Sequence, residues 1–90
     1  MPLFALICTD RPGHLETRKA NREAHLAYLK ETGCVGQAGP FLNGAGEMCG
    51  SLVVLDLAGR AEAEAWAAGD PYAKAGLFAD VRIEEWRKVI

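Results

Sequence analysis

The sequence has few of the features that mark secreted, membrane-spanning or nucleic-acid-binding proteins. Its three cysteines are odd in number and include no C-x-x-C pair, so they fit neither a disulfide framework nor a zinc site. No apolar run approaches the roughly 20 residues that cross a bilayer, and the first residues lack the basic segment of an export signal. The net charge is only −2, with both signs interspersed, so no basic surface would attract nucleic acid. We therefore expect reduced thiols, a cytoplasmic location, and neither a membrane nor a nucleic-acid partner.

Motifs for metals and common cofactors are also absent. The two histidines, His14 and His25, lie eleven residues apart and no cysteine pair accompanies them, so we predict no metal site. The segment 44–46 reads G-A-G, but it is expected to join two strands and opens no helix, unlike a dinucleotide-binding loop. Ser51 lacks the G-x-S-x-G elbow of serine hydrolases. We therefore expect a protein without a cofactor and without a serine nucleophile.

Strand-like and helix-like segments alternate along the chain and predict the fold. The expected strands are residues 3–9, 34–42, 48–57 and 77–89, and the expected helices are residues 15–32 and 60–68, followed by a helical turn at Asp70 and Pro71. The order β-α-β-β-α-β predicts a ferredoxin-like α+β fold, in which a four-stranded antiparallel sheet carries its helices on one face. The first and third strands would lie in the middle. No linker or repeat interrupts the sequence, so we expect a single domain over residues 1–90.

Helical periodicity predicts which helix faces pack against the sheet. In the first helix, the apolar face is expected to contain Leu15, Arg22, Leu26 and Leu29. In the second helix, the tightly packing face is expected to contain Ala61, Ala65 and Ala68 beside Trp66.

The face of the sheet that carries no helix is expected to bind a partner. Helices on one face leave apolar strand residues uncovered on the other, and we expect these to come from Phe4, Leu6, Leu52, Val54 and Phe78. A second copy of the chain, packed sheet against sheet, would cover them. We therefore predict a homodimer through the open face of the sheet.

Three polar residues on the first helix form the main candidate site. His25 can take or give a proton near neutral pH, as few side chains can without a large pKa shift. Steps of four and three residues place Arg18, Arg22 and His25 along one stripe, where one bound anion would meet all three. The structural alternative is that both arginines are solvated and that His25 is a half-buried ring. Asp70 has a structural role of its own, because aspartate is a favoured N-cap before proline.

Several short strings resemble the YciI-like family, which belongs to the dimeric α/β-barrel group of ferredoxin-like domains. They are R-E-A-H-L at residues 22–26, A-G-P at 38–40, G-S at 50–51, D-P-Y at 70–72 and A-G at 75–76. The resemblance runs nearly from end to end. It implies that His25 and Asp70 form the His-Asp pair proposed as the family's active site.

The lone pairs of the carboxylate and the packing of both segments on one face of the sheet indicate how this pair would be arranged. One oxygen of Asp70 would cap the helical turn while the other holds the His25 ring and fixes its tautomer. We expect the two side chains to meet within roughly 2.6 to 3.2 Å, at the rim of a cleft between the first helix and the sheet. The hydroxyls of Ser51 and Tyr72 would help to orient a substrate oxygen. For these two residues, local packing is an equally good interpretation.

The function implied by the resemblance is cofactor-free proton transfer on a small anionic or ring-shaped substrate. Relatives in the family and its wider group include a chlorinated-hydroquinone dehydrochlorinase and muconolactone-isomerase-like proteins, which favours lyase or isomerase chemistry. The alternative is a non-catalytic protein that binds a small ligand, or a dimeric scaffold with a structural His-Asp pair. Haem chemistry also occurs in the wider group, and His14 or His25 could then be an axial ligand, but nothing in the sequence selects that role.

Overall fold

The computed structural model describes residues 2–90 and contains the predicted order of elements. The strands are β1 (Leu3–Asp10), β2 (Val35–Leu42), β3 (Met48–Asp56) and β4 (Phe78–Trp86), and the helices are α1 (Leu15–Thr32), α2 (Arg60–Gly69) and α3 (Pro71–Lys74). The helical turn expected at residues 70–71 is α3. The last strand was predicted to continue to residue 89, but β4 ends at Trp86. Within residues 2–90, no helix is both long and apolar enough to cross a membrane.

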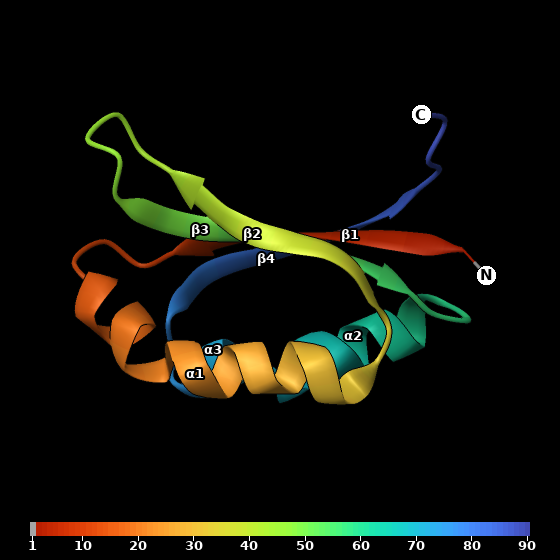
Figure 1. Cartoon of the computed structure of the whole chain (residues 1–90), viewed down its shortest axis with the longest axis horizontal. Coiled ribbons are helices and arrows are strands. Elements are labelled where there is room, and N and C mark those ends of the chain that lie inside the picture. The colour runs from red at the N-terminus through yellow and green to blue at the C-terminus, as the bar shows by residue number, and fades with distance from the viewer. Residues whose placement is uncertain (1) are drawn as a thin grey trace.

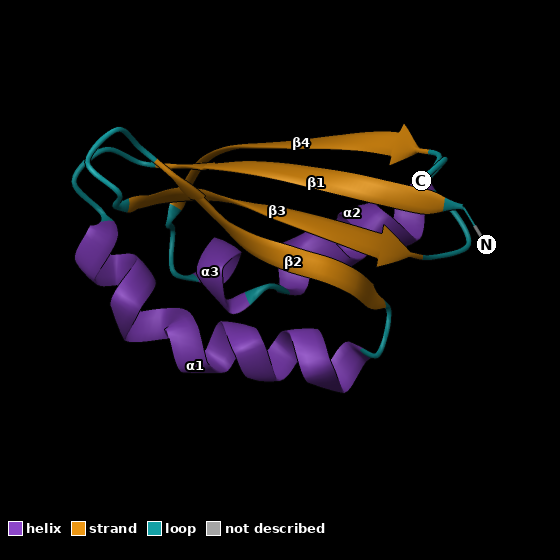
Figure 2. Cartoon of the chain, turned by 45° about the horizontal axis from the view of Figure 1, so that its top comes forward, coloured by secondary structure: helices purple, strands orange, loops and turns teal. Residues whose placement is uncertain are grey.

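The sheet has the predicted ferredoxin-like topology. Its strand order is β2-β3-β1-β4, and every neighbouring pair is antiparallel, so β1 and β3 lie in the middle as expected (Figure 2). All three helices lie on one face of the sheet, whereas the tip of the β2–β3 hairpin and the C-terminus point to the other side (Figure 1). The helix-covered face therefore holds the core, and the opposite face is open.

The prediction of which residues lie on the open face was wrong for β1. Phe4 and Leu6 are buried in the core beneath the helices. Phe4 pairs with Leu55 and Leu6 pairs with Val53, and these partners face the same core because directly paired residues share a face. Apolar residues at both alternating sets of positions had left the face of β1 undetermined.

The β4 prediction for Phe78 was wrong as well. Its ring meets the ring of Tyr72 edge to face, with centroids 6.0 Å apart, and it packs against the helix-side core. Leu52 and Val54, by contrast, have the opposite orientation to Val53 on β3 and lie on the open face, as predicted, but Val54 is buried there and only Leu52 is half-buried. They pair with Ile7 and Ala5 of β1, which extend the apolar strip across the two central strands.

The buried helix faces also differ from the predicted ones. In α1 the buried residues are Arg18, His25 and Leu29, whereas Arg22 and Leu26 are exposed. The buried stripe thus contains two polar residues, which an apolar pattern does not reveal. Gly33 ends α1 with a left-handed backbone (φ 67°), the conformation in which glycine commonly ends helices.

In α2 the predicted alanine face was wrong. Ala61, Ala65 and Ala68 are exposed, and Ala63 is buried together with Trp66. Residues three apart share one face of a helix, so burial of the bulky Trp66 side chain also turns Ala63 towards the core. Trp66 and Ala63 join the core cluster, whose other buried members are Leu29 and residues of β1 and β3.

Candidate functional site

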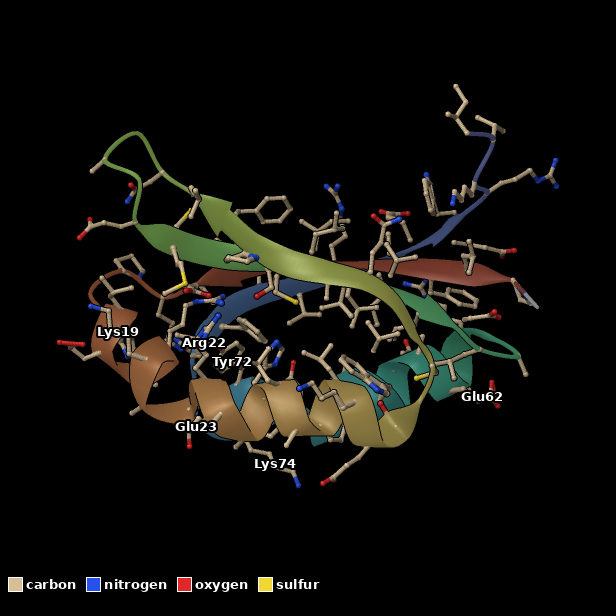
Figure 3. All side chains as sticks on the ribbon, viewed as in Figure 1. Lys19, Arg22, Glu23, Glu62, Tyr72 and Lys74 are labelled. Carbon is tan, nitrogen blue, oxygen red and sulfur yellow. The ribbon has the colours of Figure 1, made fainter. Side chains whose placement is uncertain are left out.

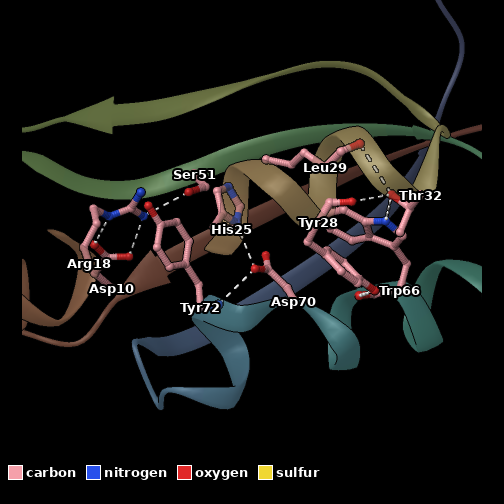
Figure 4. Close-up of polar contacts among 10 residues, drawn as sticks. All are labelled: Asp10, Arg18, His25, Tyr28, Leu29, Thr32, Ser51, Trp66, Asp70 and Tyr72. Atoms are coloured by element: carbon pink, nitrogen blue, oxygen red, sulfur yellow. Dashed lines mark hydrogen bonds and ion pairs between the residues drawn. The ribbon is translucent and has the colours of Figure 1, made fainter. Parts of the chain in front are cut away.

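His25 and Asp70 meet between α1 and the α2–α3 junction. Nδ1 of His25 lies 2.8 Å from Oδ1 of Asp70, inside the expected range, and both side chains are buried (Figure 4). The carboxylate accepts this hydrogen bond, so Nδ1 carries the proton. In the neutral ring Nε2 is then an acceptor, and it takes part in none of the hydrogen bonds found among residues 2–90. This arrangement presents Nε2 for proton transfer.

Asp70 also caps α3, although not in the expected way. Its Oδ1 accepts a hydrogen bond from the backbone N–H of Tyr72 at 3.0 Å, and Pro71 occupies the first helical position. We had expected one carboxylate oxygen for the cap and the other for His25, but Oδ1 serves both. A carboxylate oxygen has two lone pairs, so one atom can accept both bonds. The cap and the His25 contact are therefore fixed together.

The ring of Tyr72 packs directly on the imidazole. The two ring centroids are 3.9 Å apart and the planes differ by 14°, and the guanidinium carbon of Arg18 lies 4.7 Å from the Tyr72 centroid. Burial raises the pKa of Tyr72, although the positive charges of Arg18 and Arg22 act to lower it. The phenol therefore stays neutral at physiological pH, and its ring is a platform that holds the imidazole plane.

Arg18 is a buried cation with a dedicated partner. Its Nε and Nη2 donate to the two carboxylate oxygens of Asp10 at 2.7 and 2.9 Å. Nη2 also donates to Oγ of Ser51 at 2.9 Å. Burial acts to lower the pKa of Arg18, but the hydrogen bond and charge of Asp10 raise it above its ordinary value. Arg18 is therefore protonated, and its charge is balanced by the carboxylate of Asp10. It is not the open anion-binding cation that the sequence suggested.

A cavity of about 150 Å³ opens beside His25. Side chains of α1 form one wall, and β2 and β3 form the other. The lining residues are Arg18, Arg22, His25, Leu26, Leu29, Ala38, Gly39, Pro40, Met48, Ser51, Val53 and Tyr72. Arg22 is exposed at this cavity and belongs to none of the ion pairs found among residues 2–90. Figure 3 shows Arg22 and Tyr72 between α1 and the sheet, whereas Glu23 and Lys74 point away.

Five of the six residues predicted for the site line this cavity, Asp70 lies behind it as the partner of His25, and no cysteine lines it. Cys8 is buried and Cys34 and Cys49 are half-buried, and none forms a disulfide. Burial raises the pKa of the Cys8 thiol to about 12, so this thiol is not a nucleophile near neutral pH. No group of three or more potential metal-ligating side chains occurs within residues 2–90.

The sequence interpretation missed two parts of the site. Asp10 carries no motif that marks it as a site residue, yet it holds Arg18. A buried arginine requires a carboxylate partner, but nothing in the sequence indicated that Arg18 is buried. The apolar wall was missed because Leu29, Pro40 and Met48 come from three different elements.

Comparison with known proteins points to one family. The sequence profile of the YCII-related domain matches residues 2–87. The chain is 33% identical over 96 residues to "Protein YciI" of Escherichia coli O6:H1, an alignment that covers 97% of this chain and 98% of the relative. It is 36% identical over 96 residues to an uncharacterized protein of Haemophilus influenzae, with 96% and 97% of the two chains covered.

A solved structure is similar over most of the chain. It is 5-chloro-2-hydroxyhydroquinone dehydrochlorinase from Burkholderia phenoliruptrix AC1100 in complex with 2,5-dihydroxybenzoquinone. The TM-score is 0.88 and the sequence identity is 35%, with 94% of this chain and 93% of that chain covered. The two proteins therefore share the fold along nearly their whole length.

Proposed function

Because the chain belongs to the family of YCII-related domains, as the resemblance predicted, we propose that it is a cofactor-free enzyme that uses His25 for proton transfer. The observation that carries this proposal is the hydrogen bond between His25 and Asp70 beside a cavity. A buried histidine whose Nδ1 is held by a carboxylate and whose Nε2 is unbonded has the arrangement of a general base.

The proposed mechanism assigns one role to each member of the pair. Nε2 of neutral His25 takes a proton from the substrate, and the negative charge of Asp70 stabilises the imidazolium that forms. The imidazolium then returns the proton, either to another atom of the substrate, as in an isomerase, or to a departing group, as in a lyase. Tyr72 keeps the ring in plane during both transfers through its stacking contact.

Two other residues are proposed to hold the substrate. Arg22 is the exposed cation at the cavity, so it would bind an anionic group. Ser51 accepts a hydrogen bond from Arg18, which leaves the hydroxyl proton of Ser51 to donate to a substrate oxygen. Arg18 would thus act on the substrate through Ser51, whose hydroxyl it orients.

The size of the cavity favours a substrate with one ring. Its volume of about 150 Å³ is well below the roughly 300 to 1,000 Å³ of sites for drug-sized ligands. Leu26, Leu29, Pro40 and Val53 provide apolar contacts for a ring, and the polar groups lie at its edge. The dehydrochlorinase structure contains an oxygenated six-membered ring compound, so we propose oxygenated, chlorinated single-ring compounds as the substrate class.

The experiment is a turnover assay on a panel of chlorinated hydroxyhydroquinones and unsaturated lactones, with a thermal-shift measurement on the same compounds. Wild type should convert at least one compound, and His25→Ala should reduce kcat by roughly 10²- to 10⁴-fold, since general acid–base help is typically of that size. The matched control is His14→Ala, because the hydrogen bond found for the His14 side chain is to the backbone carbonyl of Pro12 and His14 lies outside the cavity. Stabilisation by a compound without any turnover would instead support the non-catalytic binding protein.

We also propose that the chain is a homodimer through its open sheet face and that it is cytoplasmic. The strip formed by Ile7, Leu52 and Val54 is covered by no helix. Val54 is already buried among its neighbours, whereas Ile7 and Leu52 are half-buried, and Phe41 and Trp86 at the ends of the strip are 39% and 40% exposed. A second copy would bury this strip by the same surface on both chains. Three cysteines without a disulfide fit a reducing compartment.

A further inference from the structure

Tyr28 links α1 to the end of α2 one helical turn beyond His25. Its hydroxyl donates a hydrogen bond to the backbone carbonyl of Trp66 at 2.8 Å, and the two rings are tilted by 45° with centroids 4.9 Å apart (Figure 4). Trp66 lies four residues before Asp70. Two contacts therefore bridge the same two segments: Tyr28 to Trp66, and His25 to Asp70.

The carbonyl of Trp66 is available because α2 ends early. In a continuing helix it would accept the N–H of Asp70, four residues later. Asp70 instead has extended backbone angles (φ −62°, ψ 127°), and its N–H bonds to the carbonyl of Ala67 at 3.3 Å. The Tyr28 hydroxyl supplies the missing donor. A side chain of α1 thus caps the last turn of α2 at the point where the chain turns to place Asp70.

Gly69 is required by the same contact. A Cβ on Gly69 would lie 2.5 Å from the Tyr28 hydroxyl oxygen, which is closer than Cβ atoms approach other heavy atoms, and at a tight 3.2 Å from the ring carbon Cζ, so the Tyr28 side chain would have to shift. The backbone of Gly69 does not have a positive φ, so its conformation does not call for glycine. The residue directly before Asp70 is therefore small because Tyr28 packs against it.

Thr32 closes the cluster of Tyr28, Thr32, Trp66 and Gly69, which we name the helix clamp. The indole Nε1 of Trp66 donates to Oγ1 of Thr32 at 2.9 Å, and Oγ1 donates to the carbonyl of Tyr28 at 2.9 Å. Burial, followed by the charge of Asp70, raises the pKa of Tyr28, so the phenol keeps the proton that it donates. Every polar group of the helix clamp is therefore paired.

We propose that Tyr28 is a positioning residue, whose hydrogen bond to Trp66 sets the separation of α1 from the α2–α3 junction so that Asp70 reaches His25. Neither Tyr28 nor Gly69 lines the cavity, so they act on the site only through this separation. The expected effect on turnover rests on the proposed function. The effect on the His25–Asp70 hydrogen bond does not.

The test compares wild type with Tyr28→Phe, which removes only the hydroxyl. The first readout is the proton NMR signal of the His25 Nδ1–H, assigned by its absence in His25→Gln. In Tyr28→Phe this signal should broaden or disappear, because a looser hydrogen bond to Asp70 exposes the proton to exchange with water. The second readout is kcat, which should fall by roughly 10- to 100-fold with KM little changed, since a small misplacement of a catalytic group is costly.

Gly69→Ala provides an independent route to the same defect, because its methyl group displaces the Tyr28 hydroxyl. It should weaken the same NMR signal, and the double variant should be no worse than either single one. Leu57→Ala is the control for general loss of stability, since Leu57 packs on the core outside both the cavity and the helix clamp.

The outcomes separate this proposal from the proposed function. A wild-type imidazole signal in folded Tyr28→Phe would overturn the positioning role, as would an unchanged signal in Gly69→Ala if Tyr28→Phe does not fold. Loss of the signal in Tyr28→Phe or Gly69→Ala, but not in Leu57→Ala, supports the positioning role even if wild type turns over no compound. In that case only the proposed enzymatic function fails.

Discussion

Asp70 lies 45 residues after His25 in the sequence, yet its Oδ1 is 2.8 Å from Nδ1 of His25 and is the same atom that caps α3. One oxygen thus ties the orientation of the imidazole to the first turn of a short helix. A change in that turn is therefore expected to shift the hydrogen-bond partner of the histidine as well. The two roles of Asp70 are separable only by substitutions that keep the shape of the side chain.

Asp70→Asn and Asp70→Ala should therefore differ in their effects. The asparagine oxygen can still accept from Tyr72, so stability should change little, whereas kcat should fall because a neutral amide does not stabilise the imidazolium. Asp70→Ala removes the cap and leaves His25 without its partner, which should cost about 1 to 3 kcal/mol of unfolding free energy. Urea unfolding and steady-state kinetics measure the two effects. Equal loss of stability in both variants would contradict this separation.

Loss of Asp10 should destabilise the protein more than loss of any surface carboxylate. The side chains of Arg18 and Asp10 are 3% and 7% exposed, so Asp10→Ala leaves a buried cation without a partner. We expect a loss of about 3 kcal/mol or more, measured by chemical denaturation. The control is Glu16→Ala, because Glu16 pairs with Lys19 at the surface and should contribute less than about 1 kcal/mol. Similar values for the two variants would show that Arg18 finds another partner.

Leu52→Asp should dissociate the proposed dimer without unfolding the chain. It places a charge in the centre of the strip that a second copy would bury, so the dissociation constant should rise by roughly 100-fold or more. Sedimentation velocity over a range of concentrations measures this. Ala61→Asp adds the same charge on the opposite, helix-covered side and should leave the dimer intact. A monomeric wild type at micromolar concentration would refute the dimer.

The Cys8 thiol should make the fold sensitive to alkali. Burial, followed by the charge of Asp70, raises the pKa of Cys8 from 9.0 to about 12, so the folded state holds this proton more tightly than the unfolded state. The stabilisation is complete below pH 9.0 and is lost as the pH rises towards 12, with a slope of about 1.4 kcal/mol per pH unit for one group. Tyr28 and Tyr72 have raised pKa values and act in the same direction.

Urea unfolding of wild type and Cys8→Ala across this pH range isolates the contribution of the thiol. The variant should be less stable at neutral pH because it loses buried volume, but its stability should fall less steeply with pH. Parallel curves for the two proteins would mean that Cys8 does not titrate in this range.

The fold was largely predictable because its signals are local. The bounds of α1 follow from a run of helix-forming residues that ends at Gly33, and the edge position of β2 follows from Pro40. The orientation of β1 was not predictable, because Phe4 and Ile7 belong to opposite faces and both are apolar. Only the pairing of β1 with β3 in the structure shows that Phe4 and the residues on its side of the strand face the helices.

The site was predictable as a set of residues but not as an arrangement. The resemblance to a family indicated His25 and Asp70, and the spacing along α1 indicated Arg18 and Arg22. Spacing alone does not distinguish a solvated arginine from a buried one, since that depends on Asp10, which lies on another element. The role of Tyr28 had no sequence signal, because it depends on where α2 ends.

The part of the cavity wall that β2 forms differs in one respect from the parts formed by α1, β3 and Tyr72. β2 is an edge strand with β3 as its only neighbour, and none of the residues of the hydrogen-bonded network lies on it. Substitutions at Ala38 and Pro40 would therefore reshape the space for a ligand and leave the histidine and its partners in place. In evolutionary terms, the proposed function would place the reacting groups on α1 and the α2–α3 junction, and part of the selectivity for a substrate on β2. Related chains would then be able to diversify the molecules that they accept by changing one strand at the margin of the sheet.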